Sequence, residues 1–252
     1  MVGGEFPIVN NFRNFPYPIH HEVNRMILVL NCMKDDILAQ SFDRAISRPL
    51  DQAGKKADFL RVPSAGEIPD LARYSHFIIS GSEASVLDDN PWEGLLKEIS
   101  HKIIDMKKPL LAICYGHQFL VRALLGKQSV RRTATPEFGW VDITLTGNPL
   151  FDGITASVFM VSHYDEVCNL TDDFKIIASS PRCAVHAFQY KDLPVWGLQF
   201  HPEYNVREAD EIFDLIKKRD PLFSIYFFND PGNEMQMKME QNERIFLNFL
   251  AI

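Results

Sequence analysis

Short apolar runs alternate with amphipathic segments through the first half of this 252-residue chain. Four of the runs have the length of buried strands, namely Met26–Leu30, Phe59–Val62, Phe77–Ile79 and Pro109–Ile113. Several of the segments between them carry apolar residues at helical spacing. Strands and helices in this order predict a parallel sheet with helices on both faces. We therefore expect an open, mostly parallel α/β fold.

Helix boundaries can be predicted at several places. An early helix is expected over Asp36–Ile46. Asn90 is expected to cap a later helix that begins at Pro91, with Glu93 reaching back to the cap amide. The helix that follows the Pro109–Ile113 run is expected to end at Gly126.

The second half of the chain holds more strand candidates and fewer helices. The candidates are Val141–Leu145, Val158–Val161, Lys175–Ala178, Ala184–Tyr190 and Val195–Phe200. Because few helices separate them, we expect an additional region of antiparallel or mixed strands here. A helix around Ala209–Ile216 and a last helix ending near Leu250 complete the prediction.

No internal repeat or linker divides the chain, so a single domain is expected over residues 26–252. Residues 1–25 contain three prolines and few periodic apolar residues, and we expect an irregular N-terminal extension there. An aromatic loop at residues 221–231 would be a docking patch if it were exposed. We expect it instead to pack under the last helix.

Charge and cysteine content narrow the classes of partner. The net charge of -7 disfavours binding to nucleic acid and to anionic membranes. No apolar stretch reaches the roughly 18–20 residues of a membrane span, and no secretory signal is evident. The four cysteines are scattered and show no metal-ligand spacing, so a reducing, cytoplasmic compartment and no metal are expected.

Cys114 follows the apolar run 109–113 directly and precedes a predicted helix. A nucleophile at such a strand-to-helix turn is exposed at the carboxyl edge of the sheet, and Gly116 relieves crowding there. The helix N-terminus would favour the thiolate, and the N–H of Tyr115 would be free to face an oxyanion. A buried structural role is expected for Cys32, Cys168 and Cys183.

A cysteine nucleophile needs a base, and the base needs a group that orients it. His201 and Glu203 follow the strand candidate 195–200 and are separated by Pro202. Glu203 lies close enough to accept a hydrogen bond from the imidazole and fix its tautomer. His117 is the alternative base, but a side chain in the first helical turn is expected to point away from the thiol.

These residues resemble the signature of the class I glutamine amidotransferases. Its cysteine elbow is matched by residues 114–118 (Cys-Tyr-Gly-His-Gln), and its histidine segment by residues 199–203 (Gln-Phe-His-Pro-Glu). Segments 137–140 (Glu-Phe-Gly-Trp) and 162–165 (Ser-His-Tyr-Asp) are similar to the glutaminase domain of GMP synthase. The resemblance covers roughly residues 26–219 and implies a flavodoxin-like sheet and a Cys114–His201–Glu203 triad.

The resemblance also implies the rest of the site. A turn at Gly81 and Ser82 would supply the second oxyanion amide beside that of Tyr115, although the family commonly has Gly-Gly-Pro where this chain has Gly-Ser-Glu. The residues expected near the substrate are Gln118, Ser162, His163 and Asp165. Asp165 is a candidate partner for the α-ammonium of the substrate, and backbone contacts are the equal alternative. The alternative for 162–165 is an ordinary polar turn.

Three functions remain open from the sequence. The first is a glutaminase that releases ammonia from glutamine and hands it to a separate synthase subunit. The second is a stand-alone γ-glutamyl peptidase that acts on glutathione-like conjugates. The third is a non-catalytic regulatory module, which the intact triad argues against. No metal or organic cofactor is implied by any of them.

Overall fold

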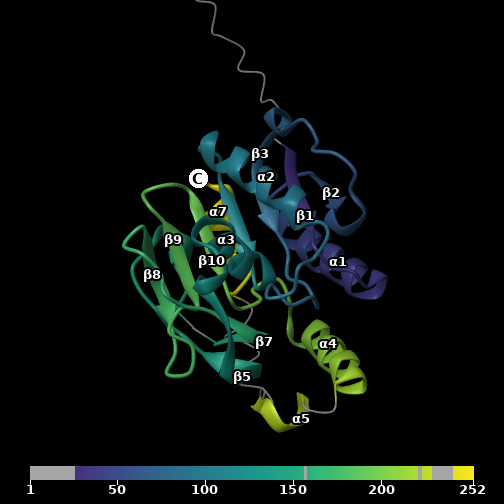
Figure 1. Cartoon of the computed structure of the whole chain (residues 1–252), viewed down its shortest axis with the longest axis vertical. Helices are drawn as coiled ribbons and strands as arrows, with labels where there is room; N and C mark the ends of the chain where they lie inside the picture. The colour runs from purple at the N-terminus through teal and green to yellow at the C-terminus, as the bar shows by residue number, and fades with distance from the viewer. Residues whose placement is uncertain (1–25, 156–157, 221–222, 229–240) are drawn as a thin grey trace, which may run out of the picture.

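The computed structural model describes residues 26–155, 158–220, 223–228 and 241–252. Its main element is an eight-stranded sheet with the order β2-β1-β3-β4-β10-β9-β8-β6 (Figure 1). The expected extension at residues 1–25 and much of the 221–231 loop lie outside the described residues. Within these residues, no helix is both long enough and apolar enough to cross a membrane.

The parallel half of the sheet is built from four strands of the first half of the chain and from β10 of the second half. The strands are β1 (Met26–Asn31), β2 (Ala57–Arg61), β3 (Tyr74–Ile79), β4 (Leu110–Ile113) and β10 (Val195–Leu198), and each neighbouring pair is parallel. The helices are α1 (Asp36–Gln52), α2 (Glu93–Asp105) and α3 (Tyr115–Leu125). The predicted α/β architecture is confirmed.

Antiparallel strands extend the sheet and form a second one, also as predicted. β9 (Ala187–Tyr190), β8 (Phe174–Ser179) and β6 (Thr144–Leu145) continue from β10 with antiparallel pairing. A small second sheet joins β7 (Val158–Val167), β5 (Val130–Asp142) and β11 (Phe227–Phe228). The remaining α-helices of the described residues are α4 (Val206–Arg219), α5 (Phe223–Tyr226) and α7 (Arg244–Leu250).

Apolar side chains alternate between the two faces of the parallel strands and bury both. Along β4, Leu111 and Ile113 join one core cluster, whereas Leu110 and Ala112 join the other. The first cluster is covered by α1, α4 and α7, and the second by α2 and α3. This two-sided burial explains why these strands read as continuous apolar runs in the sequence.

Several predicted boundaries are wrong. The predicted strand 141–145 is divided between the end of β5 and β6, and the first eleven residues of β5 were not predicted. A register shift between Arg132 and Glu137 interrupts the pairing of β5 with β7, which hides the strand's periodicity. Residues 162–165 lie inside β7, so they are not a polar turn.

The predicted cap of α2 is also wrong. The helix begins at Glu93, its cap position is Trp92, and the Trp92 side chain makes no capping hydrogen bond. Asn90 instead donates from its side-chain amide to the Ser85 carbonyl and to Glu93. At the other end of the next helix, Gly126 adopts a positive φ of 99°, as its predicted role in ending α3 requires.

The described part of the aromatic loop gives a mixed result. Phe223 is buried with 2% exposure and packs against Phe138 and Phe213. Ile225 is 70% exposed and Phe227 is 36% exposed. Phe223 therefore packs in the core, and Tyr226 packs partly buried against the same cluster, but the Phe223 ring contacts β5 and α4 rather than the last helix.

Replacement of Gly116 by alanine tests how tightly α3 packs on the sheet. A β-carbon there would lie 2.7 Å from Cγ2 and 2.9 Å from the carbonyl oxygen of Ile79. We expect Gly116→Ala to lower the free energy of unfolding by about 1–3 kcal/mol, measured by urea denaturation. Gly94→Ala on α2 is the control, because a β-carbon there meets nothing within 4 Å. Equal stability of the two variants would contradict the prediction.

Candidate active site

Cys114 joins β4 to α3 at the carboxyl end of the central strand. Its φ of 49° lies in a region that residues with a side chain rarely adopt, so the turn is strained. The Cys114 N–H donates to the Leu198 carbonyl at 2.7 Å, and the Gly116 N–H donates to the Ser80 carbonyl at 3.1 Å. The neighbours of β4 on both sides thus hold the predicted strand-to-helix turn.

His201 and Glu203 lie where the chain leaves β10. The His201 N–H donates to the Met160 carbonyl at 2.8 Å, and its ring Nδ1 lies 2.8 Å from Oε1 of Glu203. A methyl group added at Gly81 would lie 3.1 Å from His201 Cε1 and 3.5 Å from Cys114 Cβ. The structure therefore gathers the predicted thiol, imidazole and carboxylate at one place, and all three are buried.

The electrostatics of this group favour a charged imidazole. Burial by itself lowers the pKa of His201, but the negative charges of Glu203 and of a Cys114 thiolate outweigh it. Together with the hydrogen bonds to these two side chains, they raise the pKa of His201 to about 10. The geometry can therefore hold a thiolate–imidazolium pair, which is the reactive form of a cysteine nucleophile.

Two backbone segments can face an oxyanion beside the thiol. The N–H of Tyr115 belongs to the first turn of α3 and has no intrahelical acceptor. The second segment is the turn at Gly81 and Ser82, near Cβ of Cys114. Two hydrogen bonds hold this turn against the loop after β1, one donated by the loop and one donated by the turn. The Cys32 N–H donates to Ser80 Oγ at 2.7 Å, and Ser82 Oγ donates to the Cys32 carbonyl at 2.8 Å.

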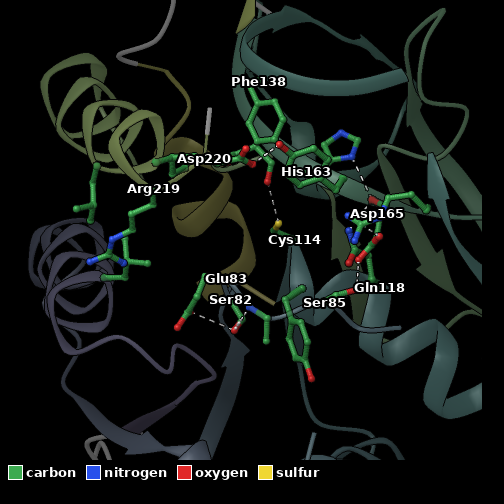
Figure 2. Close-up of a pocket in the computed structure, with 18 residues that line it drawn as sticks. Ser82, Glu83, Ser85, Cys114, Gln118, Phe138, His163, Asp165, Arg219 and Asp220 are labelled. Carbon is green, nitrogen blue, oxygen red and sulfur yellow. Dashed lines mark hydrogen bonds and ion pairs between the residues drawn. The ribbon is translucent and has the colours of Figure 1, made fainter. Parts of the chain in front are cut away.

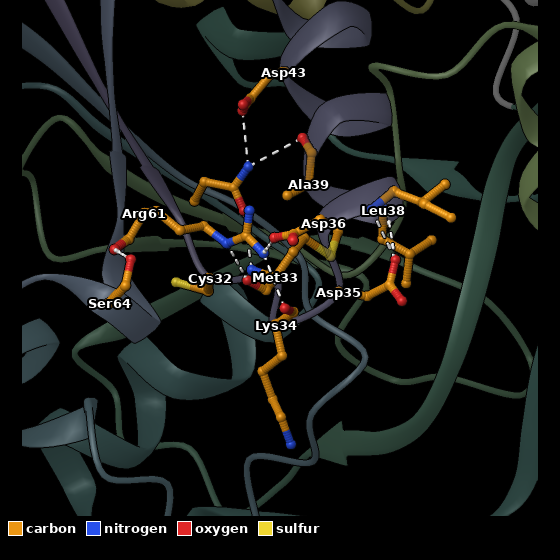
Figure 3. Close-up of polar contacts among 12 residues, drawn as sticks. Cys32, Met33, Lys34, Asp35, Asp36, Leu38, Ala39, Asp43, Arg61 and Ser64 are labelled. Carbon is orange, nitrogen blue, oxygen red and sulfur yellow. Dashed lines mark hydrogen bonds and ion pairs between the residues drawn. The ribbon is translucent and has the colours of Figure 1, made fainter.

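Glu83 holds this turn where the family commonly has a proline. Its carboxylate accepts from the backbone N–H groups of Lys34 at 2.9 Å and Asp35 at 2.7 Å. That loop is itself rigid, because the Arg61 guanidinium donates to the carbonyls of Met33 at 2.5 Å and Lys34 at 2.9 Å (Figure 3). The exposed Glu83 side chain therefore ties the candidate oxyanion turn to the β1–α1 loop.

Ser162 and His163 of β7 form the wall above the thiol. The Sγ of Cys114 lies 3.7 Å from the Ser162 carbonyl oxygen. The ring of His163 is held between Glu137 Oε2, at 3.0 Å from Nε2, and the Asp165 carbonyl, at 3.1 Å from Nδ1. His163 therefore borders the pocket, but both of its ring nitrogens are taken up by protein partners.

Asp165 and Gln118 lie beside this wall. Asp165 accepts from Ser85 Oγ at 2.6 Å and pairs with Arg132 at 3.2 Å, and its side chain is 5% exposed. The side-chain amide of Gln118 donates to the Asp165 carbonyl at 2.7 Å and to Gln199 at 3.0 Å. Gln118 thus joins α3 to β7, and Asp165 presents a buried carboxylate at the pocket.

A cavity of about 350 Å³ opens over Cys114 (Figure 2). Besides the thiol it is bordered by Ser82, Gln118, Ser162, His163 and Asp165, so the predicted substrate residues do meet at one pocket. A further wall comes from Leu38 of α1 and from Leu215, Ile216 and Arg219 of α4. The volume is at the lower end of the range for small-molecule sites, about 300–1,000 Å³.

Several pocket residues were not predicted. Arg132 and the α4 residues carry no local motif and reach the pocket only through the tertiary fold, whereas Tyr164 belongs to the segment 162–165 that was expected near the substrate. Gln199 was quoted within the histidine segment without a role, yet its amide nitrogen lies 3.7 Å from Cys114 Sγ. Glu137 belongs to the segment 137–140, for which no role was predicted. Its position next to apolar Phe138 was the sequence feature that could have indicated its buried contact with His163.

His117 does not serve as the base. It is fully buried, and its ring packs against Phe188 with 4.9 Å between centroids. Burial lowers its pKa to about 3, so it stays neutral. The predicted orientation away from the thiol fits this packing.

Among the described residues, Glu137, Cys183 and His186 form a group whose ligand atoms lie within 4.8 Å of one another. Burial raises the pKa of Cys183 to about 12 and lowers that of His186 to about 2. The group is thus a buried set of a protonated thiol, a neutral imidazole and a carboxylate.

The family model described as glutamine amidotransferase class-I matches residues 37–217. The chain belongs to the class I glutamine amidotransferase family. Gamma-glutamyl peptidase 4 of Arabidopsis thaliana is 34% identical over 179 residues, which cover 67% of this chain and 69% of that relative. The glutamine-hydrolyzing GMP synthase of Bacillus pumilus (strain SAFR-032) is 32% identical over 198 residues.

The match to GMP synthase covers 77% of this chain but only 36% of that enzyme. A glutamine amidotransferase structure from Thermotoga maritima superposes with a TM-score of 0.72 at 20% identity, over 90% of this chain and 97% of that one. This likeness confirms the fold. Family membership makes the chain a cysteine-nucleophile amide hydrolase of the amidotransferase type.

The pKa of His201 predicts how stability depends on pH. Between the ordinary value of 6.5 and about 10, folded His201 keeps a proton that the unfolded chain has released. The stabilisation is therefore complete below pH 6.5 and is lost as the pH rises through about 10. Glu203→Gln removes a charge that raises the pKa of His201, so the pH range in which only the folded state holds this proton becomes narrower. The difference in the free energy of unfolding between the wild type and the variant should therefore shrink as pH rises, by on the order of 1 kcal/mol per pH unit. Urea denaturation from pH 6 upward measures this, and a constant deficit would contradict it.

Glu83 should matter for turnover more than for substrate binding. Glu83→Ala removes the acceptor for two backbone N–H groups and frees the candidate oxyanion turn. We expect kcat for γ-glutamyl amide hydrolysis to fall about tenfold and KM to change little. This decrease is smaller than the roughly 10²–10³-fold loss of kcat that follows complete removal of one oxyanion donor. Glu67→Ala, an exposed carboxylate outside the pocket, is the control. An equal loss in both variants, or a rise in KM alone, would refute this role.

Proposed function

We propose that this chain hydrolyses the γ-amide of glutamine with Cys114 as nucleophile. The observation that carries the proposal is the convergence of Cys114, His201 and Glu203 beside the Gly81 turn, with a 2.8 Å contact between His201 and Glu203. Nucleophile, base and orienting carboxylate are the groups that covalent acyl transfer requires. The similarity to glutamine-hydrolyzing GMP synthase supports glutamine as the substrate.

The reaction follows from this arrangement. The Cys114 thiolate attacks the γ-carbonyl carbon, and the oxyanion is held by the N–H groups of Tyr115 and of the Gly81–Ser82 turn. The C–N bond then breaks, and the imidazolium of His201 gives its proton to the departing ammonia. Neutral His201 next takes a proton from water as the water attacks the γ-glutamyl thioester. Glutamate leaves, and the thiolate–imidazolium pair is restored.

We assign the amino-acid end of the substrate to the β7 side of the pocket. Asp165 is a buried carboxylate there, and its Oδ1 makes an ion pair with Arg132 without a hydrogen bond. That oxygen can accept from an α-ammonium, and the exposed Arg132 guanidinium beside it suits an α-carboxylate. Ser162 and Gln118 would then act by holding β7 against the thiol.

We also propose that residues 26–252 act as one amidotransferase domain in the cytoplasm and that the released ammonia serves a separate synthase. The free state of all four cysteines supports a reducing compartment. The similarity to the glutamine-hydrolyzing GMP synthase supports a synthase as the destination of the ammonia. Neither nucleic acid nor a membrane is part of this proposal.

A second candidate function is hydrolysis of a γ-glutamyl peptide. The observation that favours it is the wall of α4 residues across the pocket from Asp165, since ammonia as leaving group needs no such wall (Figure 2). The 34% identity to gamma-glutamyl peptidase 4 supports it as well. The same triad would perform both reactions, with an amine in place of ammonia.

Steady-state turnover of glutamine and glutathione tests both candidates. We expect Cys114→Ala to lower turnover of the preferred substrate by on the order of 10³-fold or more, because the thioester cannot form. Cys168→Ala removes a cysteine outside the pocket and should behave as the wild type. Ammonia release from glutamine supports the first function, and glutathione cleavage supports the second. Activity that survives in Cys114→Ala would refute both.

A further inference from the structure

The residues that line the pocket lie on two sides of Cys114, and we call these sides the Asp165 lobe and the α4 lobe. In Figure 2, Gln118, Ser85 and Asp165 lie on one side of the thiol and Arg219 lies on the other. The first lobe is polar and buried. The second lobe is bordered by Leu38 of α1 and by Leu215, Ile216 and Arg219 of α4.

The two lobes differ in chemistry as the two halves of a γ-glutamyl amide do. The Asp165 lobe offers an anion and the cation of Arg132, which suits an amino-acid head group. The α4 lobe offers three aliphatic side chains followed by one guanidinium. A substrate whose γ-carbonyl lies over Cys114 and whose head group occupies the Asp165 lobe must direct its leaving group toward α4.

Arg219 can take a further anion. Its Nη2 pairs with Asp35 Oδ2 at 3.0 Å, and its side chain is 46% exposed. The other oxygen of Asp35 caps α1 by accepting from the N–H groups of Ile37 and Leu38, so Asp35 is fixed and orients the guanidinium. A guanidinium has five N–H donors, and this ion pair leaves donors for a carboxylate.

The nearby acidic side chains of this region are engaged elsewhere. Asp220 accepts from the Tyr164 hydroxyl, and Glu83 accepts from the amides of Lys34 and Asp35. Their charges limit the gain from an added carboxylate.

We propose that the α4 lobe binds the leaving group of a γ-glutamyl substrate, and that this group is an apolar amino acid or short peptide whose carboxylate pairs with Arg219. The proposal rests on the proposed cleavage by Cys114. The thiolate forms a bond to the γ-carbonyl carbon, the amide C–N bond breaks, and His201 protonates the departing α-amine. Water then hydrolyses the thioester, so the products are glutamate and the free amino acid or peptide.

Two dipeptides that differ in one charge test the proposal. γ-Glutamyl-leucine and its C-terminal amide have the same apolar body, but only the first carries a leaving-group carboxylate. We expect the wild type to prefer the acid about fivefold in kcat/KM, the size of one partly exposed ion pair, and Arg219→Met to abolish this preference. Lys218→Met removes the same charge from the neighbouring position on α4, outside the pocket, and should keep it.

A binding measurement separates this proposal from the proposed function. In Cys114→Ala, calorimetric titration with the two dipeptides should show the same preference for the acid, and Cys114→Ala/Arg219→Met should lose it. A preference that survives in Arg219→Met, or no preference in the wild type, would overturn the α4 subsite. If the wild type cleaves neither glutamine nor the dipeptides, the proposed function fails, and the calorimetric ratio still decides the subsite.

Discussion

The strained backbone of Cys114 is the constraint on which the rest of the site depends. A residue with a side chain at a φ of 49° costs about 1–3 kcal/mol unless its surroundings impose it. Here the adjacent strands impose it, because Leu198 at the end of β10 and Ser80 after β3 both accept from the elbow's amides. The same two segments lead into His201 and into the Gly81 turn. One arrangement of three parallel strands thus orders nucleophile, base and oxyanion donors together.

Burial makes these groups depend on one another. Burial by itself lowers the pKa of His201, so the imidazolium would lose its proton here without neighbouring charges. The negative charges of Glu203 and of the thiolate outweigh this effect. Glu203 is fully buried as well. Without the charge of His201 beside it, the Glu203 carboxylate would be an unpaired buried charge and would destabilise the fold. The charge on His201 therefore depends on the charges beside it, which keep the imidazole protonated well above its ordinary pKa.

The parts of the site that could be predicted from sequence are those whose signal is local. Cys114 directly follows a buried strand, and His201 and Glu203 are two residues apart after another, so strand ends alone place them at one edge. Glu83 could not be assigned in this way, because its partners are backbone amides 48 and 49 residues away. β5 was missed in its first part because the register shift near Glu137 breaks the alternation that marks a strand.

The triad does not decide which γ-glutamyl compound is cleaved. The attack on the carbonyl, the oxyanion contacts and the protonation of the leaving nitrogen are the same for ammonia and for an amine. Discrimination must come from groups that only a larger leaving group reaches. The groups that we propose for this role lie on α1 and α4, and the ion pair between Asp35 and Arg219 joins these two helices. Substrate choice can thus change through the surface of two helices while the strained elbow and its buried charges stay as they are.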